Sequence, residues 1–132
     1  MLWTPVPETK DMRCTLSKIV MPGDTNSRHS LYGGVLRAMM AEAAAIVARR
    51  HSRMDVVTAH IDSVDFEAAI LQGQLAEVAA TLVKTGRTSM TIEVLSTGED
   101  LKTGERWRCT SATIVMVAVD EERRPTPVRP AS

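Results

Sequence analysis

The 132-residue sequence predicts an α+β domain in which a curved antiparallel β-sheet wraps around one long central α-helix. Good helix formers run without a strong breaker from residue 33 to about residue 51. The segments that follow alternate apolar and polar residues, as half-buried strands do, and short turns separate them. A single apolar helix with one sheet to cover it requires a sheet that curls around the helix.

Composition limits the classes of partner. Lysine plus arginine equals aspartate plus glutamate, 16 against 16, so no net charge favours nucleic acid or a membrane surface. One Phe and one Tyr give little surface on which bases could stack. No stretch approaches the roughly 20 apolar residues of a membrane span, and the N-terminus does not resemble a signal peptide. We therefore expect a soluble, cytoplasmic globular protein with no nucleic-acid or membrane partner.

The residue types that bind metals are not grouped. Cys14 and Cys109 lie far apart and match no metal-ligand spacing, so we expect buried thiols in a reducing compartment and no disulfide. Asp62 and Asp65 belong to one predicted strand, where their spacing places them on opposite faces. The sequence therefore predicts no metal site.

The helix predicted from residue 33 to 51 is about 28 Å long at ~1.5 Å per residue, enough to cross a small domain. We expect its bulky side to pack on the sheet and its alanine side to admit a close neighbour. The bulky residues are Val35, Leu36, Met39, Met40, Ile46 and Val47. The alanines are Ala38, Ala41, Ala44, Ala45 and Ala48.

Five strands are predicted, one before the helix and four after it. Their ranges are 12–21, 56–65, 74–85, 89–96 and 106–120. Short connections at 71–73, 86–88 and 98–104 imply that consecutive strands are antiparallel neighbours.

The helix and strands belong to a predicted domain of residues 12–120, and the two ends of the chain lie outside it. Residues 1–11 form a predicted loose N-terminal arm, and residues 121–132 are charged and rich in proline, which predicts a mobile tail. The predicted helix and the sheet around it form a hotdog architecture. Its single layer leaves a sheet edge and one side of the helix exposed, so we expect a dimer or a larger assembly.

A polar loop leads directly into the glycine pair Gly33-Gly34 at the helix start. A helix N-terminus carries unpaired N–H groups and a partial positive charge, and glycine lets a substrate oxygen approach the backbone. This junction favours chemistry on a carbonyl. The simpler interpretation is a glycine at a helix start with no further role.

Several short motifs occur together along the domain. They are residues 21–26 (MPGDTN), Gly33-Gly34, residues 44–51 (AAIVARRH), 56–66 (VVTAHIDSVDF), 86–90 (GRTSM), 92–94 (IEV) and 117–120 (VAVD). In this combination the chain resembles the acyl-CoA thioesterases of the hotdog superfamily, in the group of brain acyl-CoA hydrolase and its short bacterial relatives. The resemblance implies hydrolysis of fatty acyl-CoA to free fatty acid and coenzyme A, with no metal or cofactor, in a homodimer or a hexamer built as a trimer of dimers.

The resemblance also assigns roles to residues. Asn26 matches an asparagine that orients substrate or water and faces a helix aspartate of the partner subunit, and the amides near Gly33 and Gly34 match those that hold the thioester oxygen. Coenzyme A would lie near a turn whose guanidinium and hydroxyls suit phosphates, formed by Gly86, Arg87, Thr88 and Ser89. An ordinary solvated arginine explains Arg87 equally well.

The chain departs from the family at the helix carboxylate. That position is Ala41 here, and removal of a general base typically costs about 10²–10⁴ in rate. Glu42 is the fallback carboxylate, although one helical residue is about 100° of rotation. Either the carboxylate has been lost or relocated, or an aspartate has been replaced deliberately; the intact surroundings favour the second.

Two other functions stay open. Residues 23–29 resemble the hydratase signature G-D-x-N-P-x-H, with Ser27 in place of proline, so Asp24 and His29 could form an acid/base pair of an enoyl-CoA hydratase. The short distance from His29 to Gly33 and the downstream motifs favour a thioesterase. The absence of a carboxylate at Ala41 also fits a non-catalytic acyl-CoA-binding module.

Overall fold

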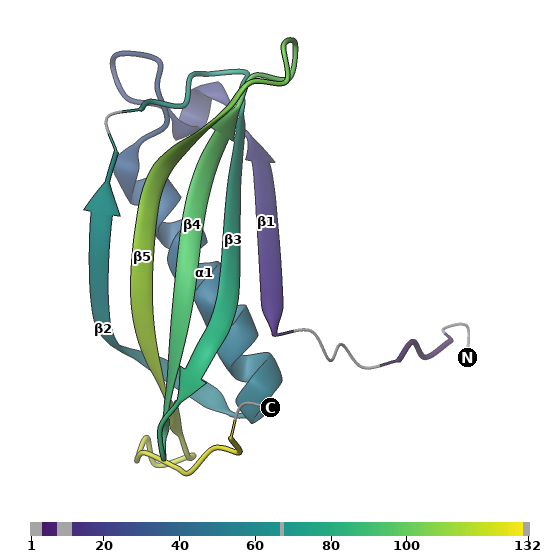
Figure 1. The fold of residues 1–132 in the computed structure, drawn as a ribbon, viewed down its shortest axis with the longest axis vertical. Helices are drawn as coiled ribbons and strands as arrows, with labels where there is room; N and C mark the ends of the chain where they lie inside the picture. Colours follow the sequence, from purple (N-terminus) through teal and green to yellow (C-terminus); the bar gives the residue numbers. More distant parts are fainter. Residues whose placement is uncertain (1–3, 8–11, 67, 131–132) are drawn as a thin grey trace.

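The computed structural model describes residues 4–7, 12–66 and 68–130. A five-stranded antiparallel sheet, in the order β1-β3-β4-β5-β2, curves around α1 (Gly33–Ser52), which confirms the predicted hotdog fold (Figure 1). The strands are β1 (Arg13–Ile19), β2 (Asp55–Asp65), β3 (Leu75–Thr85), β4 (Ser89–Glu99) and β5 (Arg106–Val119), with a short 3-10 helix η1 (Pro22–Asp24) after β1.

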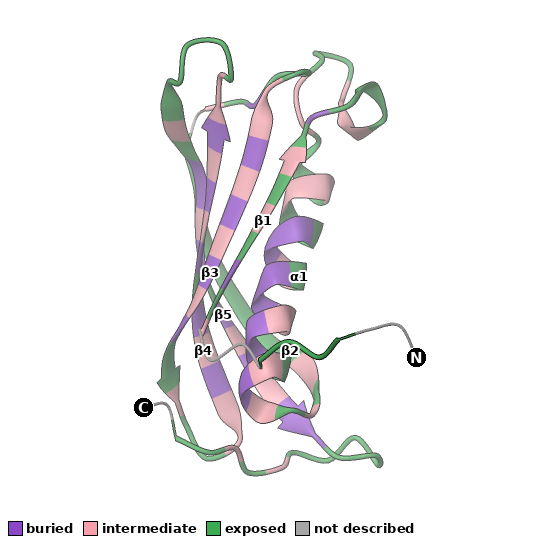
Figure 2. Ribbon diagram, turned by 90° about the vertical axis from the view of Figure 1, so that its right-hand side faces the viewer, coloured by how far each residue is buried: buried purple, intermediate pink, exposed green. Residues whose placement is uncertain are grey.

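The core lies between α1 and the concave face of the sheet, where buried and less buried residues alternate along the central strands (Figure 2). The inward face predicted for β3 and β4 is confirmed. Its buried residues are Ala76, Val78, Ala80, Leu82, Met90, Ile92 and Val94. β4 continues three residues beyond its predicted end, because a bulge at Ser96/Thr97 lets its pairing with β5 run on to Glu99.

The predicted division of the helix into a bulky side and an alanine side is wrong. Ala44 and Ala48 are fully buried together with Met40 and Val47, whereas Ala38 is exposed. Small side chains let strands that curve around a helix approach it closely, so alanines belong in this contact as much as bulky residues do. The alanines therefore form part of the core.

The predicted pairing of consecutive strands is wrong for β2. Its neighbour is β5, in a register from Asp55↔Val119 to Asp65↔Thr110, and it forms one edge of the sheet. Residues 68–74 cross the end of the sheet to reach β3 (Figure 1). This connection is fixed to the loop before α1, since Leu31 N donates to Ile70 O over 2.7 Å and Gln72 N donates to His29 O over 2.9 Å. The end of β2 and the start of α1 therefore lie at the same end of the molecule.

The edge formed by β2 is apolar and open. Ile61, Val64 and Phe66 are exposed by 52%, 59% and 41% respectively. In the part of the chain that the structure describes, no strand pairs with the outer side of β2. Exposed backbone groups and apolar side chains on one edge favour pairing with another chain.

Residues 121–130 lie against the end of the domain. Thr126 N donates to Ala118 O over 2.8 Å, and Val128 N donates to Arg87 O over 2.9 Å. His51, at the helix end, is buried and its Nε2 lies 2.7 Å from Arg129 O. The predicted mobile tail thus has fixed contacts as far as residue 129. Of the predicted N-terminal arm, residues 4–7 are exposed; residues 1–3 and 8–11, like 131 and 132, lie outside the described residues.

The predicted burial of the cysteines is confirmed: Cys14 and Cys109 are both buried, and both are free. Among the described residues, the helices lack the combination of length and apolar character that a bilayer crossing requires.

Candidate active site at the start of the helix

The first turn of α1 offers free backbone donors at the surface. The amides of Val35 and Leu36 donate to Tyr32 O, over 3.0 and 3.2 Å, whereas the amides of Gly33 and Gly34 donate no hydrogen bond within the described residues. Tyr32 precedes the helix in an extended conformation and does not cap it with its side chain. Gly33 and Gly34 are both exposed, so a ligand oxygen could reach their N–H groups.

The glycine pair has close neighbours. A Cβ atom on Gly34 would lie 3.3 Å from the Tyr32 ring, and one on Gly33 would lie 3.7 Å from Arg37 Nη1. An aromatic ring and a guanidinium therefore flank the free amides. The guanidinium adds positive charge to that of the helix terminus.

Asn26 organises the loop that leads to the helix. Its Oδ1 accepts hydrogen bonds from Arg28 N over 2.9 Å, Ser30 N over 3.3 Å and Ser30 Oγ over 3.1 Å. Its Nδ2 group donates no hydrogen bond in the described parts of the chain. The oxygen is thus occupied by the loop, and the amide donor is the group left for a ligand.

Asp24 and His29 are not paired. The Asp24 carboxylate accepts a hydrogen bond from Met21 N over 3.0 Å and lies 3.1 Å from Lys18 Nζ. The bond from the Met21 amide, and then that from Lys18, lower the pKa of Asp24. His29 is exposed with φ 60°, and its backbone amide donates to Asn26 O. The carboxylate is used in the turn, and the structure gives no support to a hydratase-like acid/base pair.

Ala41 and Glu42 face different edges of the sheet. Burial raises the pKa of the Cys14 thiol on β1, the charge of Arg50 lowers it, and the charge of Glu42 raises it. Because a charge acts on a thiol in this way only from nearby, Glu42 lies toward β1. Arg37, one turn before Ala41 on the same helix face, reaches Asp65 at the end of β2. Glu42 therefore does not occupy the surroundings of position 41.

The structure does not bring the predicted coenzyme A turn to the start of the helix. Gly86, Arg87, Thr88 and Ser89 connect β3 to β4 at the opposite end of the molecule (Figure 1). β3 starts near the loop before α1, and at about 3.3 Å per residue its length separates the two ends by roughly 30 Å. The turn itself is tight, since Gly86 N donates to Ser89 O over 2.9 Å. Within one chain, the two groups of predicted site residues are apart.

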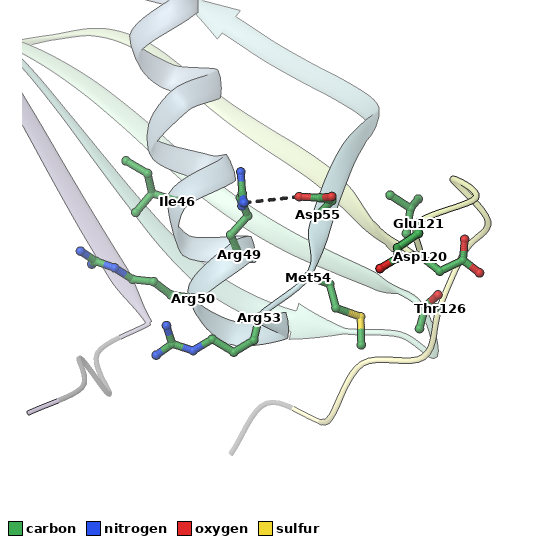
Figure 3. Close-up of a pocket in the computed structure, with 10 residues that line it drawn as sticks. Ile46, Arg49, Arg50, Arg53, Met54, Asp55, Asp120, Glu121 and Thr126 are labelled. Carbon is green, nitrogen blue, oxygen red and sulfur yellow. Dashed lines mark ion pairs between the residues drawn. The ribbon is translucent and has the colours of Figure 1, made fainter.

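A groove of about 850 Å³ at the other end of α1 was missed from the sequence (Figure 3). Its lining residues are Ile46, Arg49, Arg50, Arg53, Met54, Asp55, Val119, Asp120, Glu121 and Thr126. Arg49 Nη2 lies 3.3 Å from Asp55 Oδ1, and a dashed line marks this ion pair in Figure 3. The arginines at the helix end and the acidic residues after β5 are visible in the sequence, but only the fold brings them together.

Asp65 was also missed as a candidate. Its Oδ1 accepts a hydrogen bond from Thr110 Oγ1 over 3.1 Å, and its Oδ2 accepts one from Arg37 Nη2 over 3.3 Å. The prediction that Asp62 and Asp65 lie on opposite faces is confirmed: Asp62 lines a hollow on the outer face of the sheet with Glu93 and Thr113. The position of Asp65 at the end of a predicted strand was visible in the sequence, but its nearness to the start of the helix was not.

Comparisons with known proteins agree with this geometry. The sequence profile of the thioesterase superfamily matches residues 29–105. An uncharacterized acyl-CoA thioester hydrolase of Zymomonas mobilis is 41% identical over 112 residues, covering 85% of this chain and 75% of the relative.

Solved structures share the fold. A hexameric acyl-CoA thioesterase, crystallised in its apo form, superposes with a TM-score of 0.88 at 39% identity, covering 93% of this chain and 79% of that one. An acyl-CoA hydrolase from Staphylococcus aureus in complex with butyryl coenzyme A, coenzyme A and coenzyme A disulfide superposes with a TM-score of 0.84 at 28% identity, covering 97% and 78%. The chain therefore belongs to the thioesterase superfamily.

Proposed function

We propose that this protein hydrolyses acyl-CoA thioesters to a free carboxylic acid and coenzyme A. The observation that carries the proposal is the pair of free, exposed amides of Gly33 and Gly34 at the N-terminus of α1. Relatives that match along most of the chain are named acyl-CoA thioester hydrolases.

The thioester oxygen would bind at the start of the helix. When water attacks the carbonyl carbon, the oxygen becomes an oxyanion, which the Gly33 and Gly34 amides and the helix dipole stabilise. Asn26 would donate from Nδ2, since its Oδ1 is already used by Ser30 and Arg28. Loss of one such donor typically costs about 10²–10³ in kcat.

The complete site would need two chains. Because the turn of residues 86–89 lies at the end opposite Gly33 and Gly34, it reaches the thioester only if it belongs to a second subunit. Two β2 edges paired antiparallel would place the turn end of one chain beside the helix start of the other. There the Arg87 guanidinium and the hydroxyls of Thr88 and Ser89 would contact the phosphates of coenzyme A.

The open, apolar β2 edge supports the dimer. A hexamer is the finer proposal, since relatives of known structure are named hexameric. No cofactor takes part in the proposed reaction. A location in the cytoplasm stays a prediction.

The test is a panel of acyl-CoA substrates of increasing chain length, with free-thiol release as the readout. We expect turnover by the natural chain, and a further rise of about tenfold or more in Ala41→Asp, which adds a carboxylate on the helix face that carries Arg37. Ala38→Asp, on an exposed helix position, is the matched control and should leave the rate unchanged. Glu42→Gln should also leave it unchanged, because Glu42 lies toward β1.

Two results would contradict the proposal. Tight coenzyme A binding without turnover, in both the natural chain and Ala41→Asp, would identify a non-catalytic binding module. Hydration of enoyl-CoA that His29→Ala abolishes would identify a hydratase.

A further inference from the structure

We infer that Asp65 is the carboxylate that activates the hydrolytic water, in place of a carboxylate at position 41. The inference rests on the proposed thioester hydrolysis and adds a catalytic residue to it. Asp65 is outside the loop and the glycine pair described above, and comes from the last residue of β2.

The strand alternation directs Asp65 toward the helix. Thr110, its partner in the β2–β5 register, is buried, and the two side chains are hydrogen bonded, so they share the concave face of the sheet. Asp62 and Val64 line the hollow on the opposite face. Asp65 is therefore the aspartate of this strand that faces α1.

Both oxygens of Asp65 are held in place. Thr110 Oγ1 fixes Oδ1 at 3.1 Å and Arg37 Nη2 fixes Oδ2 at 3.3 Å. The other guanidinium nitrogen, Arg37 Nη1, lies 3.7 Å from the position that a Cβ on Gly33 would take. One guanidinium thus spans from the carboxylate to the helix terminus that would hold the thioester oxygen.

The two residues that bond this carboxylate, Arg37 and Thr110, also line a cavity of about 50 Å³. Its lining residues are Arg37, Met40, Ile61, Ser63, Thr110, Ala112 and Ile114. The space has room for a water molecule, and its polar groups come from Arg37, Ser63 and Thr110. Two of these three residues also bond Asp65, so a water held there would be close to the carboxylate.

The other carboxylates near the first half of the helix are placed differently. Glu42 lies toward Cys14 on β1, and Asp24 is bonded to Met21 N and Lys18. Neither reaches the side of the helix on which Ala41 and Arg37 lie. Asp65 does, and Arg37 is the charged group that the structure places against it.

The step balances without a further reactant. Asp65 accepts one proton from water as the water oxygen bonds to the thioester carbon, and the carbonyl π electrons move to the oxyanion at the helix start. The oxyanion then re-forms the carbonyl and the C–S bond breaks. The proton passes from Asp65 to the coenzyme A thiolate, so that thioester and water give acid and thiol.

The experiment compares Asp65→Asn with Asp62→Asn, an aspartate of the same strand on the outer face. Both are assayed for thiol release with the acyl-CoA panel, and for coenzyme A binding by calorimetry. We expect Asp65→Asn to lose about 10²–10⁴ in kcat while coenzyme A still binds, and Asp62→Asn to match the natural chain. Turnover of Asp65→Asn at the natural rate overturns the inference and leaves the proposed function standing. A natural chain without turnover of any substrate overturns both.

A second variant covers the case in which Asp65→Asn does not fold. Thr110→Val keeps the side-chain shape but removes the hydroxyl that donates to Asp65 Oδ1, so one of the two contacts that hold the carboxylate is lost. We expect kcat to fall by about tenfold or more while coenzyme A still binds. A natural kcat in Thr110→Val, in a chain that folds and binds coenzyme A, counts against Asp65 as the base.

Discussion

The side-chain oxygen of Asn26 accepts a hydrogen bond from the Ser30 hydroxyl over 3.1 Å, and this bond closes the loop that precedes α1. Two backbone amides, of Arg28 and Ser30, donate to the same oxygen. A single side chain therefore both shapes the loop and presents its Nδ2 group outward. These two roles can be separated by substitution.

Asn26→Asp separates them, because an aspartate keeps an oxygen for the loop and removes the Nδ2 donor. We expect kcat/KM for acyl-CoA to fall by about 10²–10³ with little change in Tm. Ser30→Ala is the control: it removes one donor to Oδ1, so it should lower stability by about 1 kcal/mol and retain most activity. Natural activity in Asn26→Asp would show that the amide donor has no part in the reaction.

The turn at η1 should depend on pH through Asp24. The bond from Met21 N, followed by that from Lys18, lowers the folded-state pKa of Asp24 below its usual 3.8. A depressed carboxylate pKa stabilises the fold above the unfolded value, and this stabilisation is lost as pH falls through the folded value. Urea unfolding of Asp24→Asn should therefore show a deficit against the natural chain at pH 6 that shrinks as the pH falls below 3.8 and through the folded-state pKa. A deficit independent of pH would exclude the ionised carboxylate as its source.

Gly98 should tolerate no side chain, because the ring of Trp107 lies directly over it. A Cβ at Gly98 would be 2.5 Å from Trp107 Nε1 and 2.6 Å from Cε2, in a buried part of the β4–β5 pair. We expect Gly98→Ala to lower the free energy of unfolding by about 1–3 kcal/mol. Gly23→Ala, whose Cβ would meet no described atom within 4 Å, is the matched control.

A partner substitution tests the origin of that loss. In Gly98→Ala with Trp107→Leu, the smaller side chain removes the clash, so the two effects should be less than additive. Additive effects in calorimetric unfolding would assign the loss to the backbone.

The two thiols should be unreactive in the folded protein. Burial raises the pKa of the Cys14 thiol and that of the Cys109 thiol. Little of either thiol therefore exists as the reactive thiolate near pH 8. A thiol-specific chromophoric disulfide should therefore react fully with the native chain only after denaturant is added. Fast labelling of either cysteine before denaturation would contradict the burial. This result also determines whether the protein contributes background to a thiol-release assay.

The sequence predicts much of the fold because the relevant signals are local. Period-two alternation located β3 and β4 with their inward faces, and the uninterrupted helix formers located α1 to within a residue. The pairing of β2 with β5 depends instead on how the sheet curves and closes over the helix, which no local pattern records. The helix faces were assigned wrongly for the same reason, since the closeness of Ala44 and Ala48 to the strands is set by that curvature.

The site was predicted in part. The glycine pair and Asn26 could be located, because a helix start and a loop asparagine have recognisable sequence neighbours. Asp65 could not, since its contacts to Arg37 and Thr110 join residues far apart in sequence. The contacts of residues 121–130 were also missed: proline and charge predict mobility, but the amides of Thr126 and Val128 lie between the prolines and bond to the domain.

The central claim is that one active site takes its parts from two chains. Asn26→Asp and Arg87→Ala, each impaired alone, are co-expressed with different tags, and complexes carrying both tags are isolated. In a hybrid dimer with two-chain sites, one site loses both residues and the other retains both. We expect about half of the natural kcat/KM to return. Hybrids no more active than the average of the two parent variants would contradict the two-chain active site, because each chain would then carry its own defective site.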